Sequence, residues 1–486
     1  MRVFIFGIGG TGSRVLRSLT MLMASGVVMQ NDPAIIPVII DTDAHNGDTA
    51  RTRELLRSYH TVRSKFVNRG TNAVQRAFFN TAIRSFNNAD EDASSSANLD
   101  FQFNFQNQDN TFANFIGYNS LSPQNKDVIE LLYNDSLDEH PELHLNLNVG
   151  FKGNPNIGCI VFNDLKNSQQ FKDLEGSFTQ QDRIFIISSI FGGTGSSGFP
   201  TLVKLIRSST NNNLKQAKIG AISVMPYFNV ETDTNSAINS AVFDTKTKSA
   251  LSFYALDSDL RSVNALYYIS DNNTGGCLPN VEGGEDQQNN AHLIELIAST
   301  SIIDFINKDD NDLSAPTCYE FGAEENGNPF TIAHFNNSTK TNYIEPLVRF
   351  AIAAKTATDF VPNLKDQSFY RDLNISGGMG IPNEFNRLNL FFEEFKKWTA
   401  SEMNSNNNGR MFYSFNFEAP DHINTLIDGK VISTGFLNKG FTSKKLAGKM
   451  NSHLAKEQKD IKDPIKYLNI LYKTAEETLR EMGQLP

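Results

Sequence analysis

The stretch Val3-Phe4-Ile5-Phe6-Gly7-Ile8-Gly9-Gly10-Thr11-Gly12 joins an apolar run to a glycine-rich motif. Val3–Phe6 is β-branched and aromatic, as expected of a buried strand, and Ser13–Ala24 has the apolar spacing of a helix. Glycines between a strand and a helix permit a tight turn and bring backbone N–H groups close to a phosphate. The stretch therefore predicts a strand–turn–helix unit that binds nucleotide, although the motif alone is also compatible with a turn that holds no ligand. The residues expected at the nucleotide are Gly7, Gly9, Gly10, Thr11 and Gly12.

The alternation of strands and helices continues along the chain. Ile35–Ile40 is an apolar run ending at Asp41-Thr42-Asp43, and a continuous apolar strand after a short helix is typical of a parallel sheet covered on both faces. Further strands are predicted at Arg183–Ser189, Ile219–Met225, Ala265–Ser270, Gly409–Phe417 and Lys430–Phe436. Helices are predicted at Thr49–Tyr59, Ala73–Phe86, Pro200–Ser208, Ala237–Leu256, Asn290–Ile306, Tyr343–Phe360, Leu388–Met403 and Asp463–Met482. The tract Asp309–Asn328 is polar and turn-rich.

A second glycine loop, Gly192-Gly193-Thr194-Gly195-Ser196-Ser197-Gly198, also follows a predicted strand and precedes a predicted helix. Two phosphate-cradling loops in one α/β unit are not a feature of dinucleotide-binding domains. This loop resembles the GGGTGSG or GGGTGTG signature of the tubulin/FtsZ superfamily, with Phe191 and Ser197 as departures. Ile40–Ala44 resembles the NTDA segment of FtsZ, and Gly150–Gly158 resembles its GAGANPEVG loop. The chain is thus identified as a divergent, bacterial FtsZ-like member of that superfamily.

The resemblance assigns roles to individual residues. Asp41 and Asp43 would lie near phosphate and Mg²⁺, and Lys152 would add a cation to the loop that covers the terminal phosphate. Pro226–Glu231 resembles the PFxFEG segment, so Glu231 would bind the ribose, although the arginine that follows in FtsZ is missing. Other residues implied at the nucleotide are Gly153 and Asn154 in one loop and Gly192, Gly193, Thr194, Gly195 and Ser196 in the other.

The segment Asn289–Leu296 resembles the start of the central helix of tubulin, which implies that Asn290 pairs with guanine. An Asn side chain offers a donor and an acceptor to a base, but Asn near a helix start is also a common cap. His292 and Glu295 have metal-ligand spacing without a third ligand, so a packed or interfacial histidine is favoured. After this helix, Asn307–Leu313 keeps the spacing of the FtsZ synergy loop. Asp309 and Asp312 would then polarise water in a neighbouring subunit's site, unless the tract is only a solvated acidic linker.

The predicted fold is α/β: a tubulin/FtsZ-like Rossmann-type GTPase domain with a parallel sheet, a central helix and a C-terminal α+β domain. We expect a nucleotide-binding domain over residues 1–288 with a polar insertion at about 45–145. A central helix would cover 289–308, and an activation-like domain would cover 309–486.

The composition excludes several classes of protein. Hydrophobic residues make up 39% of the 486 residues, which is enough for more than one core. A net charge of -10 does not attract nucleic acid, so no nucleic-acid partner is expected. Three scattered cysteines and no apparent targeting or membrane-spanning segment are typical of the cytoplasm.

The resemblance implies a GTP-binding, GTP-hydrolysing protein that binds GTP/GDP with Mg²⁺ and self-associates head to tail into filaments. A cytoskeletal or membrane-remodelling role, with a membrane-associated partner protein, follows from the resemblance alone. A non-polymerising nucleotide-binding switch or scaffold is the first alternative. A ThiF-like adenylyltransferase is the second, because GIGGTGS with Asp41 and Asp43 suits it, but the second glycine loop would stay unexplained. A hydride-transferring oxidoreductase would leave the same loop unexplained.

Overall fold

In the computed structural model, the described residues are 1–43, 45–67, 77–86, 99–103, 105, 110–133, 142–227, 243–270, 284–321, 334–375, 384–400, 415–417, 423–427, 440–483 and 485. The strands are β1 (Arg2–Ile8), β2 (Ala34–Ile40), β3 (Ala82–Ile83), β4 (Gln102–Phe103), β5 (Arg183–Ser189), β6 (Lys218–Val224), β7 (Ala265–Ile269) and β8 (Thr317–Phe321). The helices are α1 (Gly9–Ala24), α2 (Gly47–Phe66), α3 (Phe112–Phe115), α4 (Pro123–Leu132), α5 (Pro155–Phe162), α6 (Gln169–Ser177), α7 (Gly193–Arg207), α8 (Asn212–Lys215), α9 (Phe243–Leu256), α10 (Leu293–Asn307), α11 (Asn337–Thr339), α12 (Glu345–Lys355), α13 (Ser368–Asp372), α14 (Glu384–Ala400), α15 (Ser443–Leu454) and α16 (Asp463–Met482).

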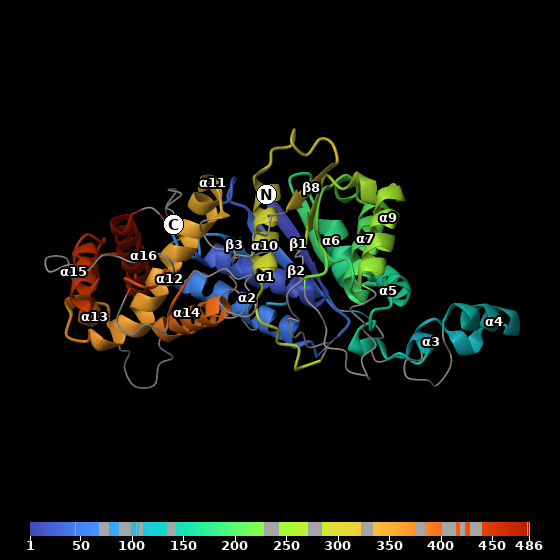
Figure 1. Ribbon diagram of the computed structural model, residues 1–486, viewed down its shortest axis with the longest axis horizontal. Helices are drawn as coiled ribbons and strands as arrows, with labels where there is room; N and C mark the ends of the chain where they lie inside the picture. The colour runs from blue at the N-terminus through green and yellow to red at the C-terminus, as the bar shows by residue number, and fades with distance from the viewer. Residues whose placement is uncertain are drawn as a thin grey trace.

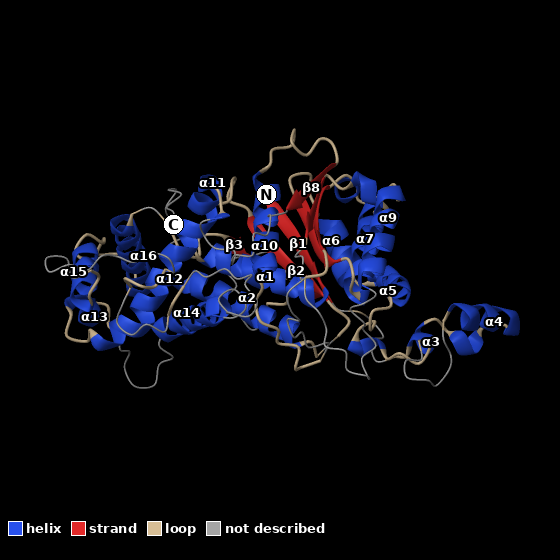
Figure 2. Ribbon diagram, in the orientation of Figure 1, coloured by secondary structure: helices blue, strands red, loops and turns tan. Residues whose placement is uncertain are grey.

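Within these residues the strands form one parallel sheet in the order β3-β2-β1-β5-β6-β7-β8, and β4 also pairs with β2. β1 and β2 are buried along most of their length because they are mostly apolar and are covered by helices on both faces. The sheet occupies the middle of the molecule (Figure 2). The predicted parallel α/β fold is confirmed.

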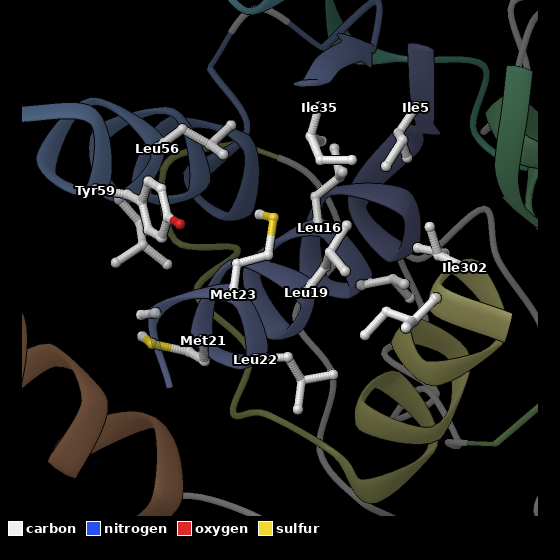
Figure 3. Packing of buried hydrophobic residues seen from close by; sticks show 14 of the residues in the cluster. Ile5, Leu16, Leu19, Met21, Leu22, Met23, Ile35, Leu56, Tyr59 and Ile302 are labelled. Carbon is white, nitrogen blue, oxygen red and sulfur yellow. The ribbon is translucent and has the colours of Figure 1, made fainter. Parts of the chain in front are cut away.

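Opposite faces of the sheet carry different helices. A Cβ built on Gly7 would lie 2.6 Å from Leu16 Cδ1 of α1, whereas one built on Gly198 of α7 would lie 2.8 Å from Ile8 Cγ2. Neighbouring residues of a strand point to opposite faces, so α1 and α7 cover opposite faces of β1. On the α1 face, Leu16, Leu19 and Met23 pack among Ile35, Leu56 of α2 and Ile302 of α10 (Figure 3).

An aromatic cluster joins the C-terminal helices to this body. Phe78 and Phe79, which follow α2 in the chain, lie with ring centroids 5.0 Å from Phe350 and 4.9 Å from Phe391, respectively. Phe350 in turn lies 4.8 Å from Phe395, and all five rings are buried. We call these five residues the phenylalanine cluster. The C-terminal helices form one end of the elongated molecule, and α3 and α4 project from the other end (Figure 1).

Several predicted elements need correction. Residues 77–86 hold β3 rather than the end of the predicted helix Ala73–Phe86, and Thr317–Phe321 forms β8 inside the tract predicted to be turn-rich. Pro200 lies inside α7 instead of starting it. Beyond residue 334, the described residues form helices joined by turns and loops, and their only β pairing is an isolated bridge between Phe415 and Ile427. The predicted strand at 430–436 lies outside the described residues. No helix in the described part of the chain has the length and apolar character needed to cross a membrane.

Candidate functional site

Two glycine loops meet at the carboxyl ends of β1 and β5. The first enters α1, where Gly9 has φ +69°, a conformation that favours glycine. A Cβ on Gly9 would lie 3.5 Å from Cβ of Thr194 in the second loop. Strand order reverses between β1 and β5, and in open α/β sheets ligands bind in the crevice beside such a reversal.

The third predicted loop, Gly150–Gly158, lies against the second, and its last residues, from Pro155 on, form the start of α5. A Cβ on Gly193 would lie 2.9 Å from the backbone N of Gly153 and 3.2 Å from that of Asn154. The fit is close enough that only glycine is accommodated at position 193. The structure therefore brings together three of the predicted nucleotide-binding segments, with the N-termini of α1 and α7 at their centre.

Glycine has a packing role at several positions of these loops. Gly12 touches β1, since its Cβ would lie 2.5 Å from the carbonyl carbon of Gly7. Gly195 lies similarly close to the carbonyl oxygen of Ser189 at the end of β5. Ser196 and Ser197, one turn into α7, donate their hydroxyls to the carbonyls of Gly192 and Gly193. Gly7, Gly12 and Gly195 thus set how closely strand and helix approach, while Gly9, Gly10, Thr194 and Ser196 are nearer to the crevice.

Asp41 and Asp43 follow β2 beside the first glycine loop, and both are buried. Asp41 accepts hydrogen bonds from Nδ2 of Asn46 at 3.1 Å and from the N–H of Asp43 at 3.2 Å. Asp43 accepts from the N–H groups of His45 and Gly284. Burial raises the pKa of Asp41 to about 7, and the Asp43 carboxylate adds to this rise.

Two residues that the sequence did not single out complete this side of the site. Asn46 caps α2 through the N–H of Thr49 and donates its Nδ2 to Oε1 of Gln287 at 2.9 Å. The Gln287 amide lies over the first glycine loop, where a Cβ on Gly10 would be 2.8 Å from Nε2. Neither residue belongs to a motif, because their roles depend on the approach of the segment before α10 to β2.

That segment leads into the central helix. α10 begins at Leu293, capped by His292 in a capping box with Glu295, which confirms His292 as a packed residue. Asn290 is exposed and lies before the helix, not in its first turn. Its neighbour Asn289 is held by Arg51, which donates to its carbonyl, and by Asp48, which accepts from its Nδ2 at 3.4 Å.

A buried polar network fixes the start of α10 against α1 and α2. Arg14 Nε lies 2.8 Å from Oε1 of Glu295, and its NH1 lies 3.4 Å from Asp48. Its NH2 donates to the hydroxyl of Tyr227, which donates to Glu295 at 3.0 Å. Burial alone would lower the pKa of Arg14, but Tyr227, Glu295 and Asp48 together raise it above its ordinary value. Arg14 therefore stays charged, and its guanidinium is bound within this network.

The predicted catalytic acids lie at the amino ends of the strands, opposite the glycine loops. Arg183, the first residue of β5, donates to the carbonyls of Phe305 and Lys308 and forms an ion pair with Asp310 at 3.0 Å. Asp309 Oδ1 accepts the N–H of Asp312 at 2.9 Å, and Asp312 Oδ2 accepts that of Asp309 at 3.3 Å. The two acids form a reciprocal, exposed turn. α10, whose 15 residues span about 22 Å, runs from the segment beside the first glycine loop to this turn.

Comparison with known proteins finds one family model that matches part of the chain. The model of a family described as "Tubulin like" matches residues 161–243, a segment that includes β5, the second glycine loop and β6. Over this segment the chain is similar to that family. No curated protein sequence matches the chain.

Two solved structures are similar at low scores. CetZ from Methanosaeta thermophila strain DSM 6194 is 14% identical, with 65% of this chain and 58% of that chain covered and a TM-score of 0.30. CetZ2 from Haloferax volcanii, described as a GTPγS-bound protofilament, is 13% identical, with 63% and 58% covered and a TM-score of 0.28. The match thus spans less than two thirds of either relative.

In the structure, the predicted site divides into three parts. The glycine loops, Asp41, Asp43, Gly153 and Asn154 converge, and the segment with Asn290 borders them through Gln287. Asp309 and Asp312 lie apart from all of these. Glu231 lies outside the described residues. Within the described chain, no group of three or more His, Cys, Asp or Glu is arranged to hold a metal ion.

Proposed function

We propose that the chain binds a guanine nucleotide at the meeting point of the two glycine loops and hydrolyses GTP when copies associate head to tail. The contact between Gly9 and Thr194 at the strand-order reversal carries this proposal. Backbone N–H groups at two helix N-termini favour an anion there. Asn290, on the segment that reaches the first loop, would recognise the base.

Mg²⁺ fits the acidic side of this crevice. Mg²⁺ is usually held by one or two carboxylates together with substrate phosphates and water. Asp41 and Asp43 would hold it, and a cation beside buried Asp41, whose pKa is raised by burial, would stabilise the charged form of that carboxyl group. The ion would supply charge neutralisation between phosphates.

Hydrolysis would need a second copy of the chain. The exposed turn of Asp309 and Asp312 lies at the amino ends of the strands, opposite the glycine loops, so in one chain these groups cannot share a nucleotide. In a head-to-tail pair the turn would face the neighbour's crevice, where a carboxylate can orient water and accept its proton. Such heterologous contacts need not close and so extend into filaments.

The first experiment identifies the nucleotide. Denatured protein is run on anion-exchange chromatography beside nucleotide standards, and binding of GTP, GDP, ATP and NAD is then titrated. Co-purified or added guanine nucleotide that binds at micromolar levels supports the proposal. Preference for ATP or NAD would contradict it and favour the adenylyltransferase or oxidoreductase alternative.

A nucleotide-binding switch that does not assemble is the second candidate. The reciprocal hydrogen bonds of Asp309 and Asp312 account for both residues as a turn, without catalysis. Sedimentation with GTP separates the two functions, because a switch stays in the supernatant and a filament pellets. A cytoplasmic location and a membrane-associated partner remain proposals by family resemblance.

A further inference from the structure

The turn that carries Asp309 and Asp312 is exposed, yet its backbone is ordered. Residues 309–312 are exposed, whereas Leu313, which follows them, is completely buried. The N–H of Leu313 donates to the carbonyl of Asp309 at 3.3 Å and closes the turn. Fixing the backbone of an exposed segment costs conformational entropy, so the order of this turn has to come from contacts with the rest of the chain.

Arg183, the first residue of β5, holds the beginning of the turn. Its NH1 donates to the carbonyls of Phe305 at 3.1 Å and Ile306 at 3.3 Å, in the last turn of α10. Such contacts satisfy the free carbonyls at the end of a helix. The same NH1 donates to the carbonyl of Lys308 at 2.8 Å, and NH2 pairs with Asp310 at 3.0 Å. The guanidinium therefore reaches past the end of the helix and into the turn.

The other end of the turn is held by two further side chains. The carbonyl of Leu313 accepts from Nζ of Lys218 at 3.0 Å and from Nδ2 of Asn264 at 2.8 Å. Lys218 is the first residue of β6, and Asn264 directly precedes β7. Asn264 is itself fixed, because its Oδ1 accepts the N–H of Ile219 at 2.9 Å. The turn is thus attached to the amino ends of three neighbouring strands.

We propose that Arg183 is a positioning residue for hydrolysis, which fixes the Asp309–Asp312 turn so that its carboxylates meet the neighbouring chain's nucleotide in a set orientation. This inference rests on the proposed function, and in particular on hydrolysis between chains. Arg183 acts through the turn, since its side chain is buried. The planar guanidinium suits this role, because it offers several N–H donors in a fixed arrangement.

The first test measures GTP turnover and the dissociation constant for GTPγS in the full chain and in Arg183→Met. Displacing a catalytic group by about 1 Å can lower a rate by about a hundredfold. We therefore expect turnover to fall at least about tenfold, with little change in affinity. Arg207→Met is the matched control, because Arg207 also donates to carbonyls near the amino end of β6, those of Lys215 and Ala217. All rates are compared below the measured melting temperatures.

Asp310→Ala tests the same contact without removing a buried side chain. The Asp310 side chain is 81% exposed, so its loss does not prevent folding, and it leaves Asp309 and Asp312 in place. An exposed ion pair contributes modestly, and we expect turnover to fall by about two- to fivefold. The affinity for GTPγS should stay unchanged, because the nucleotide lies at the other ends of the strands.

Mixing experiments assign the defect of Arg183→Met to the turn. The Asn290→Ala chain has a weakened nucleotide site and an intact turn, so adding it should restore turnover to the Arg183→Met chain. Adding Asp312→Ala should restore nothing, since both chains of that mixture have a damaged turn. A chain that was only less stable would not distinguish these two partners.

The results separate this inference from the proposed function. Wild-type turnover in both Arg183→Met and Asp310→Ala, with a loss in Asp312→Ala, would overturn the role of Arg183 and leave the proposed function standing. An equal loss in Arg207→Met would overturn that role too, as would a failure of Asn290→Ala to restore Arg183→Met where it restores Asp312→Ala. A wild type that binds guanine nucleotide but does not hydrolyse GTP would overturn hydrolysis between chains together with this inference.

Discussion

At the scale of single residues, Arg14 is a buried charge in α1, at a position where an apolar side chain would be more usual. Its guanidinium holds Glu295, Asp48 and Tyr227 together in the buried network. Removing one partner of a buried ion pair costs more than the pair itself contributes, because the remaining charge stays buried without compensation.

Arg14→Met is therefore expected to destabilise the chain by about 3–5 kcal/mol. Urea unfolding followed by fluorescence measures the loss. The exposed pair of Lys397 and Glu394 at 2.7 Å provides the control, since Lys397→Met should cost less than about 1 kcal/mol. Similar losses in the two variants would show that the Arg14 network is dispensable.

Because of Asp41, the stability of the folded chain should depend on pH in a predictable direction. Its pKa in the folded chain, about 7, is above that of an unfolded Asp, about 3.9. Proton binding therefore favours the folded state, and stability falls as pH rises from about 4 to about 7.

Asp41→Asn should remove this part of the pH dependence. The variant is expected to gain stability over the wild type at pH 8 and to gain little at pH 4, with melting temperatures measured without nucleotide or Mg²⁺. An equal difference at both pH values would mean that Asp41 has an ordinary pKa. With Mg²⁺ and nucleotide bound, we expect the wild type to recover, because the cation stabilises the charged carboxylate.

At the scale of elements, the packing of α1 on β1 depends on a glycine. Gly12→Ala would put a Cβ 2.5 Å from the Gly7 carbonyl carbon, so the helix must move and the chain should lose about 1–3 kcal/mol or more. Gly448 lies in α15 with open space around it. Gly448→Ala should therefore raise the free energy of unfolding by up to about 1 kcal/mol. Melting temperatures that shift in the same direction would contradict this account.

The sequence predicted long apolar strands well and short, context-dependent elements poorly. Ile35–Ile40 and Arg183–Ser189 are strands because a continuous apolar run of that length has to be buried on two faces. β3 and β8 are short and are set by pairing with β2 and β7, which no local pattern encodes. α7 starts at Gly193 because the glycine loop continues directly into its first turn, so Pro200 could not mark its beginning.

The site was predictable where residues are contiguous. Both glycine loops and the Gly150–Gly158 loop carry their own signals, and the structure places them together. Asn46 and Gln287 could not be found, because they meet only when residues far apart in the chain fold onto each other. Asn290 was placed in a helix because the apolar pattern resumes nearby, whereas His292 caps the helix later.

At the scale of the whole molecule, the separation of the Asp309 turn from the glycine loops would make the proposed hydrolysis a property of two chains. Asn290→Ala should weaken nucleotide binding, and Asp312→Ala should leave binding intact but lower turnover. An equal mixture of the two variants should have more GTPase activity than either variant alone. About one random head-to-tail contact in four joins an intact nucleotide site to an intact Asp309–Asp312 turn. The release of inorganic phosphate measures this GTPase activity. No recovery, with both variants still co-sedimenting with wild type, would contradict hydrolysis across an interface.

The phenylalanine cluster has a consequence for how the molecule comes apart. Phe78 and Phe79 belong to the N-terminal half of the chain, yet they are covered by Phe350 and Phe391 from the C-terminal helices. Neither half can therefore lose its structure without exposing aromatic surface of the other. We expect heat to melt both halves in a single cooperative transition. A fragment cut between residues 321 and 334 should aggregate, because its exposed aromatic rings would pack against those of other molecules.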